Sequence, residues 1–326
     1  MGEFELIERY FSRPARRAVL GVGDDCALVA PTPGQQLAIS SDMLVEGRHF
    51  LSTVEPHALG HKALAVNLSD LAACGAAPLA FTLALAMPRI DEAFVAGFSE
   101  GLYALAAHHD IELVGGDTTA GPLAICITVF GEVEPGMALR RDGARDGDEL
   151  WVSHASGGGL GDARLALEVF RGRVALAADD FARVRRAMER PEPRVALGLA
   201  LRGVAHSAID LSDGLAGDLG HILERSRVGA RLELAALPMS PVLAAQPEAM
   251  RRECLLHGGD DYELLFSAPP DRRERVERAA QAAGVAVTCI GSIEAAAGLR
   301  LVERDGRVHD EAATGFDHFL DGQLPT

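Results

Sequence analysis

Hydrophobic and polar positions follow two periods along this chain, and segments with one period alternate with segments that have the other. Short apolar runs with strand character alternate with longer segments in which apolar residues recur every three to four positions, as in helices. The strand-like segments are residues 36–40, 79–86, 112–114, 123–133, 149–153, 208–211, 262–267 and 285–290, with a strand-turn-strand around Asp305-Gly306. The helix-like segments are residues 56–74, 91–109, 160–171, 180–190, 194–202, 213–225 and 272–283. This alternation predicts an α/β (α+β) fold.

A polar stretch at residues 140–148 interrupts the alternation near the middle of the chain. A length of 326 residues suits two domains of ordinary size. We therefore predict an N-terminal domain of residues 1–145 and a C-terminal domain of residues 146–326.

The charge of the chain limits its partners. The formal net charge is −16 and the pI is about 5.1. A field of that sign repels nucleic acid and anionic membrane, so we expect neither as a partner. No apolar run approaches the length of a membrane span, and the N-terminus lacks the basic-then-apolar order of a signal peptide. These features predict a cytoplasmic protein.

The cysteines agree with that location. The five cysteines are odd in number and far apart, and none forms a C-x-x-C motif. They are expected to be reduced and mostly buried thiols. Cys26 follows two aspartates, and a small buried apolar role is favoured for it over a reactive one.

Lysine is almost absent from the chain. Lys62 is the only lysine, so the other 30 of the 31 basic residues are arginine. The sequence contains no Gly-x-x-x-x-Gly-Lys-Ser/Thr motif, which excludes a P-loop nucleotide enzyme. Any phosphate bound here would have to be neutralised by metal ions, arginine or backbone amides.

Six short segments carry aspartate, and most of them also carry glycine or serine. Aspartates in such loops are typical oxygen ligands of magnesium, and the glycines let backbone amides approach a phosphate. Turn chemistry alone explains one such segment more easily than six. The segments are residues 21–25, 40–42, 67–70, 115–119, 209–214 and 258–263.

Asp70 is the most informative of these residues. In the helix predicted from Pro56, one face carries Leu59, Ala63, Val66 and Asp70 at alternating spacings of four and three. A lone carboxylate on an apolar stripe is unfavourable unless a cation or hydrogen-bond donors meet it. We therefore favour a metal-ligand role for Asp70 over a position at the edge of the stripe that reaches solvent.

The other segments have ordinary explanations beside the functional one. Asp24 and Asp25 are adjacent carboxylates whose mutual repulsion a divalent ion would relieve, or they belong to an ordinary turn. Residues 115–118 are expected to follow a strand, as a ligand loop or a tight strand-end turn. Ser212 is well placed as a helix N-cap, which does not explain Asp210. The glycine run at residues 156–162 is a phosphate loop or a flexible helix entry, and lone histidines such as His49 are more often structural.

Taken together, these motifs resemble the thiamine-monophosphate kinase family over nearly the whole chain. Related enzymes that share the aspartate loops include aminoimidazole ribonucleotide synthetase and selenophosphate synthetase. The matching motifs are Gly-Val-Gly-Asp-Asp-Cys-Ala from Gly21, Ala-Ile-Ser-Ser-Asp from Ala38, Arg-His-Phe from Arg48, Lys-Ala-Leu-Ala-Val-Asn-Leu-Ser-Asp-Leu-Ala-Ala from Lys62, Gly-Gly-Asp-Thr-Thr from Gly115, Ile-Asp-Leu-Ser-Asp-Gly-Leu from Ile209, Gly-Gly-Asp-Asp-Tyr-Glu-Leu from Gly258 and Gly-Phe-Asp-His-Phe from Gly315.

The resemblance implies a fold and a reaction. It implies a homodimer in which the N-terminal α/β domains pair through their sheets, with a C-terminal α/β domain packed beside each. ATP would donate its γ-phosphoryl group directly to the phosphate of thiamine monophosphate, giving thiamine diphosphate, with several Mg²⁺ ions assisting an in-line transfer.

The resemblance also implies residue roles. Two residues depart from the family pattern. Asp260 stands where glutamate is expected, so its side chain is shorter by one methylene. Phe316 stands where tyrosine is common, so its ring lacks the hydroxyl. The implied magnesium ligands are Asp25, Ser40, Ser41, Asp42, Asp70, Asp117, Asp210 and Asp213. The implied ATP contacts are Gly116, Asp117, Arg141 and Ser212, the substrate contacts are His49, Asp260 and Phe316, and the catalytic residues are Asp117, Asp210 and Asp213.

Elementary chemistry agrees with such a reaction. Donor and acceptor are both anionic, so metal ions that neutralise them would remove the main obstacle. A phosphate acceptor is already ionised near neutral pH, so no strong general base is needed. No Ser-His-Asp or Cys-His order supports covalent catalysis. The alternatives are a superfamily enzyme with another acceptor and a nucleotide-binding protein without catalysis.

Overall fold

The computed structural model of the chain describes residues 2–313, and these divide into two compact units. The first unit contains residues 2–71 and 76–136, and the second contains residues 72–75 and 137–313. Each unit combines a sheet with helices, which confirms the predicted fold class. The boundary that we placed between residues 145 and 146 stays a prediction.

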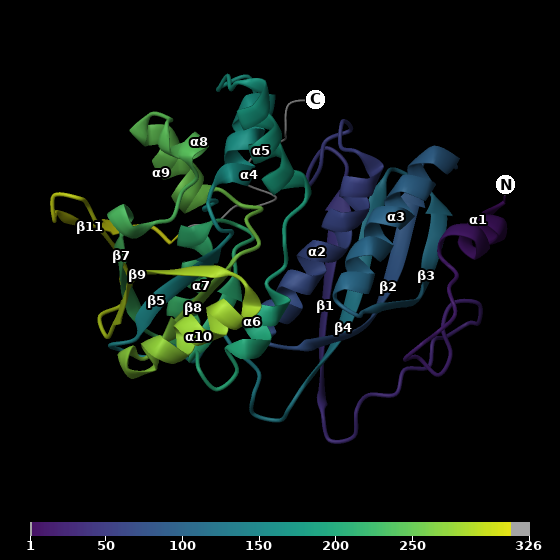
Figure 1. Ribbon diagram of the computed structural model, residues 1–326, viewed down its shortest axis with the longest axis horizontal. Coiled ribbons are helices and arrows are strands. Elements are labelled where there is room, and N and C mark those ends of the chain that lie inside the picture. The colour runs from purple at the N-terminus through teal and green to yellow at the C-terminus, as the bar shows by residue number, and fades with distance from the viewer. Residues whose placement is uncertain (1, 314–326) are drawn as a thin grey trace. The chain divides into compact units, whose positions relative to one another are not determined.

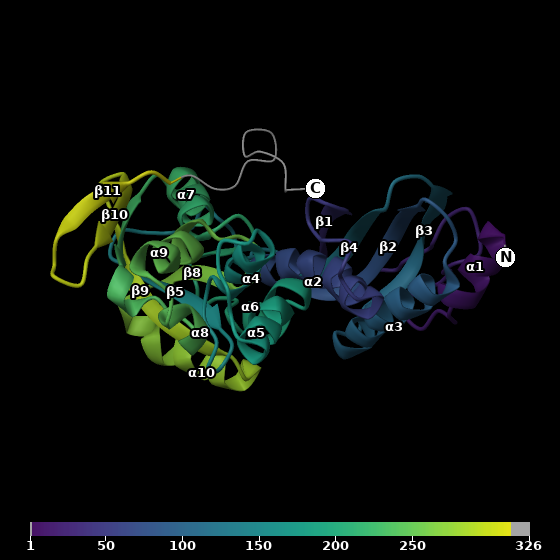
Figure 2. The same ribbon diagram turned by 90° about the horizontal axis from the view of Figure 1, so that it is seen from above.

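The first unit is a four-stranded sheet whose two long helices lie on the same face (Figures 1 and 2). The strands lie in the order β1-β4-β2-β3, antiparallel except for the parallel pair β2–β3. The strands are β1 (Gln36–Val45), β2 (Ala77–Met87), β3 (Glu112–Ala120) and β4 (Ala124–Val133), and the helices are α1 (Glu3–Tyr10), α2 (Pro56–Cys74) and α3 (Glu92–His108).

Helices α2 and α3 form where the 3.6-residue period predicts them. The start of α3 is fixed by Asp91, whose side chain accepts hydrogen bonds from the backbone N–H groups of Ala93 and Phe94. Helix α2 is buried along nearly its whole length, as expected for a helix that is apolar on most sides.

Strands β1 and β3 are longer than predicted. The expected strands at residues 36–40 and 112–114 in fact continue through Ser41-Asp42 and through Gly115-Gly116-Asp117. Pairing with β4 holds β1 extended over all its ten residues, and pairing with β2 does the same for β3. Long-range pairing therefore overrides the weak strand preference of serine, glycine and aspartate. Residues 115–118 continue the strand, so the strand-end turn that the sequence allowed as one alternative does not form.

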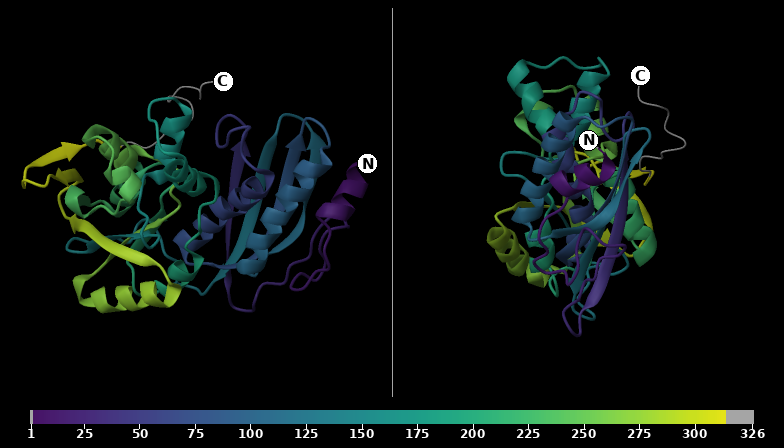
Figure 3. Two further views of the ribbon diagram at one scale, coloured as in Figure 1. Left: turned by 45° about the horizontal axis from the view of Figure 1, so that its top comes forward. Right: turned by 90° about the vertical axis from the view of Figure 1, so that its right-hand side faces the viewer.

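The second unit contains a seven-stranded sheet in the order β11-β10-β7-β9-β5-β8-β6, antiparallel except for the pair β10–β7. The β10–β11 hairpin forms one edge of the sheet (Figure 3). The strands are β5 (Glu149–His154), β6 (Ser207–Asp210), β7 (Gly229–Glu233), β8 (Leu264–Ala268), β9 (Ala286–Glu294), β10 (Gly298–Val302) and β11 (Val308–Glu311). The helices are α4 (Asp162–Phe170), α5 (Ala178–Glu189), α6 (Val195–Ala200), α7 (Leu215–Ser226), α8 (Pro241–Ala244), α9 (Glu248–His257) and α10 (Arg273–Ala283).

The central strands β5 and β8 are buried on both faces, and both read as nearly continuous apolar runs (Figure 2). One face carries Leu150, Val152 and Leu265, which pack in a core with residues of α4, α7 and α9. On the other face, the rings of Trp151 and Phe266 stack at 6.5 Å between centroids, and Arg273 of α10 lies over Trp151.

The predicted elements of the second half all occur, with ends shifted by a few residues. The sequence reasoning missed α1, β7, α8 and α9. None of the helices in residues 2–313 is both long and apolar enough to cross a membrane.

The five cysteines form no disulfide. The prediction that they are mostly buried is wrong, because only Cys254 is buried and Cys26 is exposed. Burial raises the pKa of the Cys254 thiol to about 12, so this thiol is inert.

Candidate functional site

The first group of candidate residues lies where β1 faces α2. Ser40 Oγ donates a hydrogen bond to Asp70 Oδ2 at 2.5 Å, and the backbone N–H of Asp42 donates to Asn67 Oδ1 at 3.0 Å. Leu59, Ala63 and Val66 are at most 2% exposed, which confirms the apolar stripe that singled out Asp70. The structure therefore brings Ser40, Asp42 and Asp70 together.

Ser41 points to the opposite face of the sheet. Its Oγ lies 2.9 Å from Thr128 Oγ1 and donates to the carbonyl of Ile127 at 3.2 Å. This follows from the continuation of β1, because successive side chains of a strand point to opposite faces. The side chain of Ser41 is thus separated from those of Ser40 and Asp42.

The second group lies at β3. Asp117 pairs with Ala84 of β2, which pairs with Cys126 of β4, so Asp117 lies on the same face as Ser41. Asp117 lines a small hollow with Val22 of the segment that carries Asp25. Asp25 itself lies in an exposed turn in which its N–H donates to Asp24 Oδ1 at 2.8 Å.

Gly116 has a structural reason to be glycine. Its φ is +147°, and a Cβ at this position would lie 1.8 Å from the carbonyl oxygen of Leu83. A bulge between Phe81 and Thr82 of β2 lies directly before this close approach. The close approach of β2 accounts for this glycine without a ligand, and the contact with ATP stays a prediction.

Sheet order separates the two groups of the first unit. Strand β1 and strand β3 occupy opposite edges of the four-stranded sheet. Three interstrand steps of about 4.8 Å place them about 14 Å apart. Within one chain, Asp42 and Asp117 therefore cannot hold the same ion.

The second unit brings its candidate residues together at the end of β6. Asp210 is the last residue of that strand and is 4% exposed. The backbone N–H of Asp260 donates to the carbonyl of Ser212 at 3.0 Å, and that of Tyr262 donates to Leu211 at 2.8 Å. The loop at residues 258–263 is thus bound along the loop at residues 209–214, and Asp210, Ser212, Asp213 and Asp260 lie in adjoining segments.

Asp218 is a further member of this group that the sequence reasoning missed. Its Oδ2 accepts hydrogen bonds from the backbone N–H groups of Ser212 and Asp213, both at 3.0 Å, and the residue is 2% exposed. Burial and the nearby carboxylates of Asp210 and Asp213 raise its pKa to about 8. A signal was present, because Asp218 lies on an apolar stripe of α7 with Leu215, as Asp70 does on α2.

The expected N-cap role of Ser212 is wrong. Helix α7 begins at Leu215 with Gly214 at the N-cap position, and no side chain caps it there. The amides near Ser212 are bound instead by Asp218, which reaches back from the first turn of the helix. Ser212 and Asp213 therefore keep their side chains outside the helix.

The glycine run before α4 is held in place by Asp261. Both carboxylate oxygens of Asp261 accept from the backbone N–H of Gly161 at 3.0 Å. Burial raises the pKa of Asp261 well above its usual range. A Cβ at Gly159 would lie 2.3 Å from Met239 Cα, so at least part of this run serves close packing.

The remaining predicted contacts lie in separate segments of the chain. Arg141 is exposed, and its carbonyl accepts a hydrogen bond from Ser226 Oγ at 2.8 Å. It follows Arg140, whose carbonyl accepts from the N–H of Ala208 in β6 at 3.0 Å. His49 lies in the turn after β1, and Phe316 lies outside the described residues.

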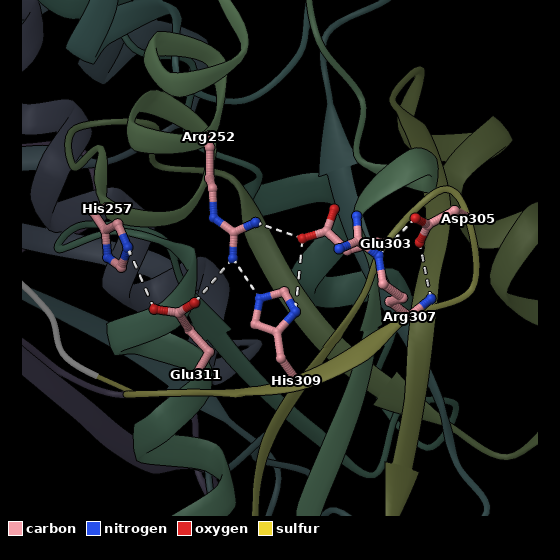
Figure 4. Close-up of polar contacts among 7 residues, drawn as sticks. All are labelled: Arg252, His257, Glu303, Asp305, Arg307, His309 and Glu311. Atoms are coloured by element: carbon pink, nitrogen blue, oxygen red, sulfur yellow. Dashed lines mark hydrogen bonds and ion pairs between the residues drawn. The ribbon is translucent and has the colours of Figure 1, made fainter.

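A polar cluster anchors α9, the helix that leads into the loop at residues 258–263 (Figure 4). Arg252 donates to Glu303 Oε1 at 2.8 Å and to Glu311 Oε2 at 3.2 Å, and lies 2.7 Å from His309 Nε2. His257, the last residue of α9, lies 3.9 Å from Glu311. The cluster ties the end of α9 to β11.

The acidic residues fit magnesium in their chemistry. No group of three or more His, Cys, Asp or Glu residues within residues 2–313 is arranged as a metal site. Magnesium does not require such a cage, because it is commonly held by one or two carboxylates together with substrate phosphates and water. Burial raises the pKa of Asp218, and the nearby carboxylates of Asp210 and Asp213 raise it further; a cation would neutralise this group of acidic side chains.

Comparison with known proteins places this architecture in a class. The model for the N-terminal domain of AIR synthase related proteins matches residues 23–133, and the model for the C-terminal domain matches residues 145–303. The two units together define a two-domain protein of the AIR synthase related class. Within that class, thiamine-monophosphate kinase of Escherichia coli (strain K12) is 46% identical over 325 residues, covering 98% of each chain.

Solved structures agree with that relationship. The crystal structure of thiamine-monophosphate kinase from Stenotrophomonas maltophilia K279a is 43% identical, covers 93% of this chain and 95% of its own, and has a TM-score of 0.83. AaThiL complexed with AMPPCP and TMP is 29% identical, with 85% and 86% coverage and a TM-score of 0.74. This chain belongs to the thiamine-monophosphate kinase family, and it is an enzyme.

Proposed function

We propose that this protein phosphorylates thiamine monophosphate with ATP to give thiamine diphosphate, by direct in-line transfer assisted by several Mg²⁺ ions. The similarity to thiamine-monophosphate kinases over 98% of the chain carries the proposal. The complex of AaThiL with AMPPCP and TMP supports ATP as the co-substrate.

Each unit would contribute its own carboxylates. In the first unit, Asp42 and Asp70 would hold one ion, and Asp25 and Asp117 belong to a separate group about 14 Å away by strand spacing. In the second unit, Asp210 and Asp213 would act as ligands. Magnesium held there would offset the repulsion between the two phosphates and the charge that develops during transfer.

The chain's own residues orient these ligands. Ser40 donates a hydrogen bond to Asp70 Oδ2 and so helps to orient this carboxylate. Asp218 holds the backbone of Ser212 and Asp213. We propose Gly116, Arg141 and Ser212 as ATP contacts, and His49, Asp260 and Phe316 as acceptor contacts. No phospho-enzyme is expected, and a covalent phosphoprotein trapped during turnover would contradict direct transfer.

Turnover by wild type and Asp70→Asn tests the assignment. We expect ADP to form from ATP and Mg²⁺ only when thiamine monophosphate is added, and Asp70→Asn to lower kcat at least about a hundredfold, because a metal ligand is lost. The measurement is ADP release with and without thiamine monophosphate. Asp110→Asn, an exposed change in the same unit, should leave the rate unchanged. Turnover that is indifferent to thiamine monophosphate would overturn the substrate.

We also propose that two copies pair through the sheet of the first unit. Leu37, Ile39 and Met43 alternate along β1 on the face opposite α2, and they are 45%, 61% and 57% exposed. An apolar row of this kind on a sheet face is typical of a protein–protein interface.

Ile39→Asp should therefore convert a dimer to a monomer, because the change would bury a charge without a partner. Light scattering coupled to size-exclusion chromatography would show the mass fall by half. Phe4→Asp, at an apolar residue of α1 that is 83% exposed, is the matched control and should leave the mass unchanged. A wild-type protein that runs as a monomer at all concentrations would contradict the proposal.

A further inference from the structure

Lys62 is the only lysine of the chain, and it is buried. It lies in the second turn of α2 and is 2% exposed. Its Nζ donates a hydrogen bond to the backbone carbonyl of His49 at 3.1 Å. The ammonium therefore binds the turn that follows β1, at the residue that we propose as an acceptor contact.

The turn around His49 is closed on itself. The backbone N–H of His49 donates to the carbonyl of Val45 at 3.0 Å, and that of Gly47 donates to the carbonyl of Phe50 at 2.8 Å. The N–H of Val45 donates in return to His49 Nδ1 at 3.0 Å. Because Nδ1 accepts this bond, the neutral imidazole carries its proton on Nε2, where it is a donor suited to an anionic oxygen.

Residue 62 is lysine in a chain that otherwise uses only arginine as its basic residue. Every other basic residue is arginine, 30 of 31 in all. A buried charge is unfavourable unless its site compensates it, so a lone buried lysine in such a chain indicates a site built for that ion. An ammonium is a compact point charge on a flexible stem, whereas a guanidinium is planar and needs more width.

We infer that Lys62 is a positioning residue for the acceptor substrate, acting through His49. Its bond to the His49 carbonyl holds the turn at residues 45–50 against α2, and the Val45 amide sets the imidazole so that Nε2–H can donate to a phosphate oxygen. The inference rests on the proposed function, in which thiamine monophosphate is the acceptor and His49 contacts it.

Steady-state kinetics of Lys62→Met test the inference, because methionine keeps the length of the stem and removes the ammonium. We expect the KM for thiamine monophosphate to rise about tenfold, the effect of losing one hydrogen bond to a charged group. The KM for ATP should stay unchanged. Lys62→Arg should recover the KM only in part, because the guanidinium does not fit. Arg17→Met is the matched control, since Arg17 also donates to backbone carbonyls of this unit, those of Pro78 and Asp110, and should leave both KM values unchanged.

A double-mutant cycle separates positioning from general support of the fold. If Lys62 acts through His49, Lys62→Met should change the KM no further in a His49→Ala background. Additive effects, or an unchanged KM in the single variant, would overturn the inference. If the wild-type protein shows no turnover that depends on thiamine monophosphate, the proposed function fails together with the inference. If the wild type does show it, a negative result with the variants overturns the inference alone.

Gly47→Ala keeps the inference testable if Lys62→Met does not fold. Gly47 has a φ of +77° and no atom within 4 Å of an added Cβ, so alanine strains the turn without touching the core. The same selective rise in the KM for thiamine monophosphate is expected. An unchanged KM would show that the turn does not set the position of His49 and would overturn the inference.

Discussion

Asp210→Asn is expected to lower kcat about a thousandfold and, in the same protein, to raise the melting temperature measured without metal. The loss of rate follows from the proposed role of Asp210 as a metal ligand, since a bound metal lowers the activation barrier by several kcal/mol. Each factor of ten in rate corresponds to about 1.4 kcal/mol of barrier height. The gain in stability follows because Asp210 is buried beside Asp218, whose pKa is raised by burial and by that neighbouring charge. Asp218 keeps its proton at neutral pH at a cost to stability, and without the charge of Asp210 the pKa of Asp218 falls and this cost becomes smaller.

The measurements are ADP release at saturating Mg²⁺ and a thermal melt in the presence of a chelator. Asp179→Asn is the control, because Asp179 is an exposed residue in the first turn of α5. It should keep its activity and change the melting temperature little. A fall in melting temperature together with the loss of activity would indicate that Asp210 is chiefly structural.

The second large effect is a dependence of stability on pH and Mg²⁺ that comes from Asp218. Burial, with Asp210 and Asp213, raises its folded pKa to about 8, whereas an aspartate in an unfolded chain has a pKa of about 3.9. Between these two values the folded chain keeps a proton that the unfolded chain has lost. The free energy of unfolding of the metal-free protein should therefore fall as pH rises from about 4 to about 8, by at most about 1.4 kcal/mol per pH unit from this group.

The difference between wild type and Asp218→Asn isolates this contribution. Because asparagine does not titrate, the variant should gain stability relative to wild type as pH rises through the same window. Urea unfolding at several pH values measures the difference. Mg²⁺ should reduce the pH dependence of wild type, because a cation favours the ionised carboxylates. A stability difference that does not vary between pH 4 and pH 8 would contradict the raised pKa.

Local pattern was sufficient for the two long helices of the first unit and for the burial of the stripe that carries Asp70, but not for α1, α8 and α9. The 3.6-residue period placed α2 at the bounds seen in the structure and put Asp70 on a buried stripe, because both depend on residues within one helix. Asp218 satisfies the same criterion on α7, where it lies on a buried apolar stripe with Leu215. Ser212 was misassigned as an N-cap because the carboxylate that binds the nearby amides comes from a turn later in the chain.

The sequence by itself determined the fold class and the family, and it predicted the aspartates that we propose as metal ligands. These depend on local periodicity and on motifs whose order is read directly along the chain. Tertiary structure alone decided how those aspartates are grouped. Pairing with β4 keeps Ser41 and Asp42 in a strand and so on opposite faces, and the order β1-β4-β2-β3 separates Asp42 from Asp117. The physical reason is that strand neighbours are chosen by contacts between residues far apart in sequence, which local pattern does not encode.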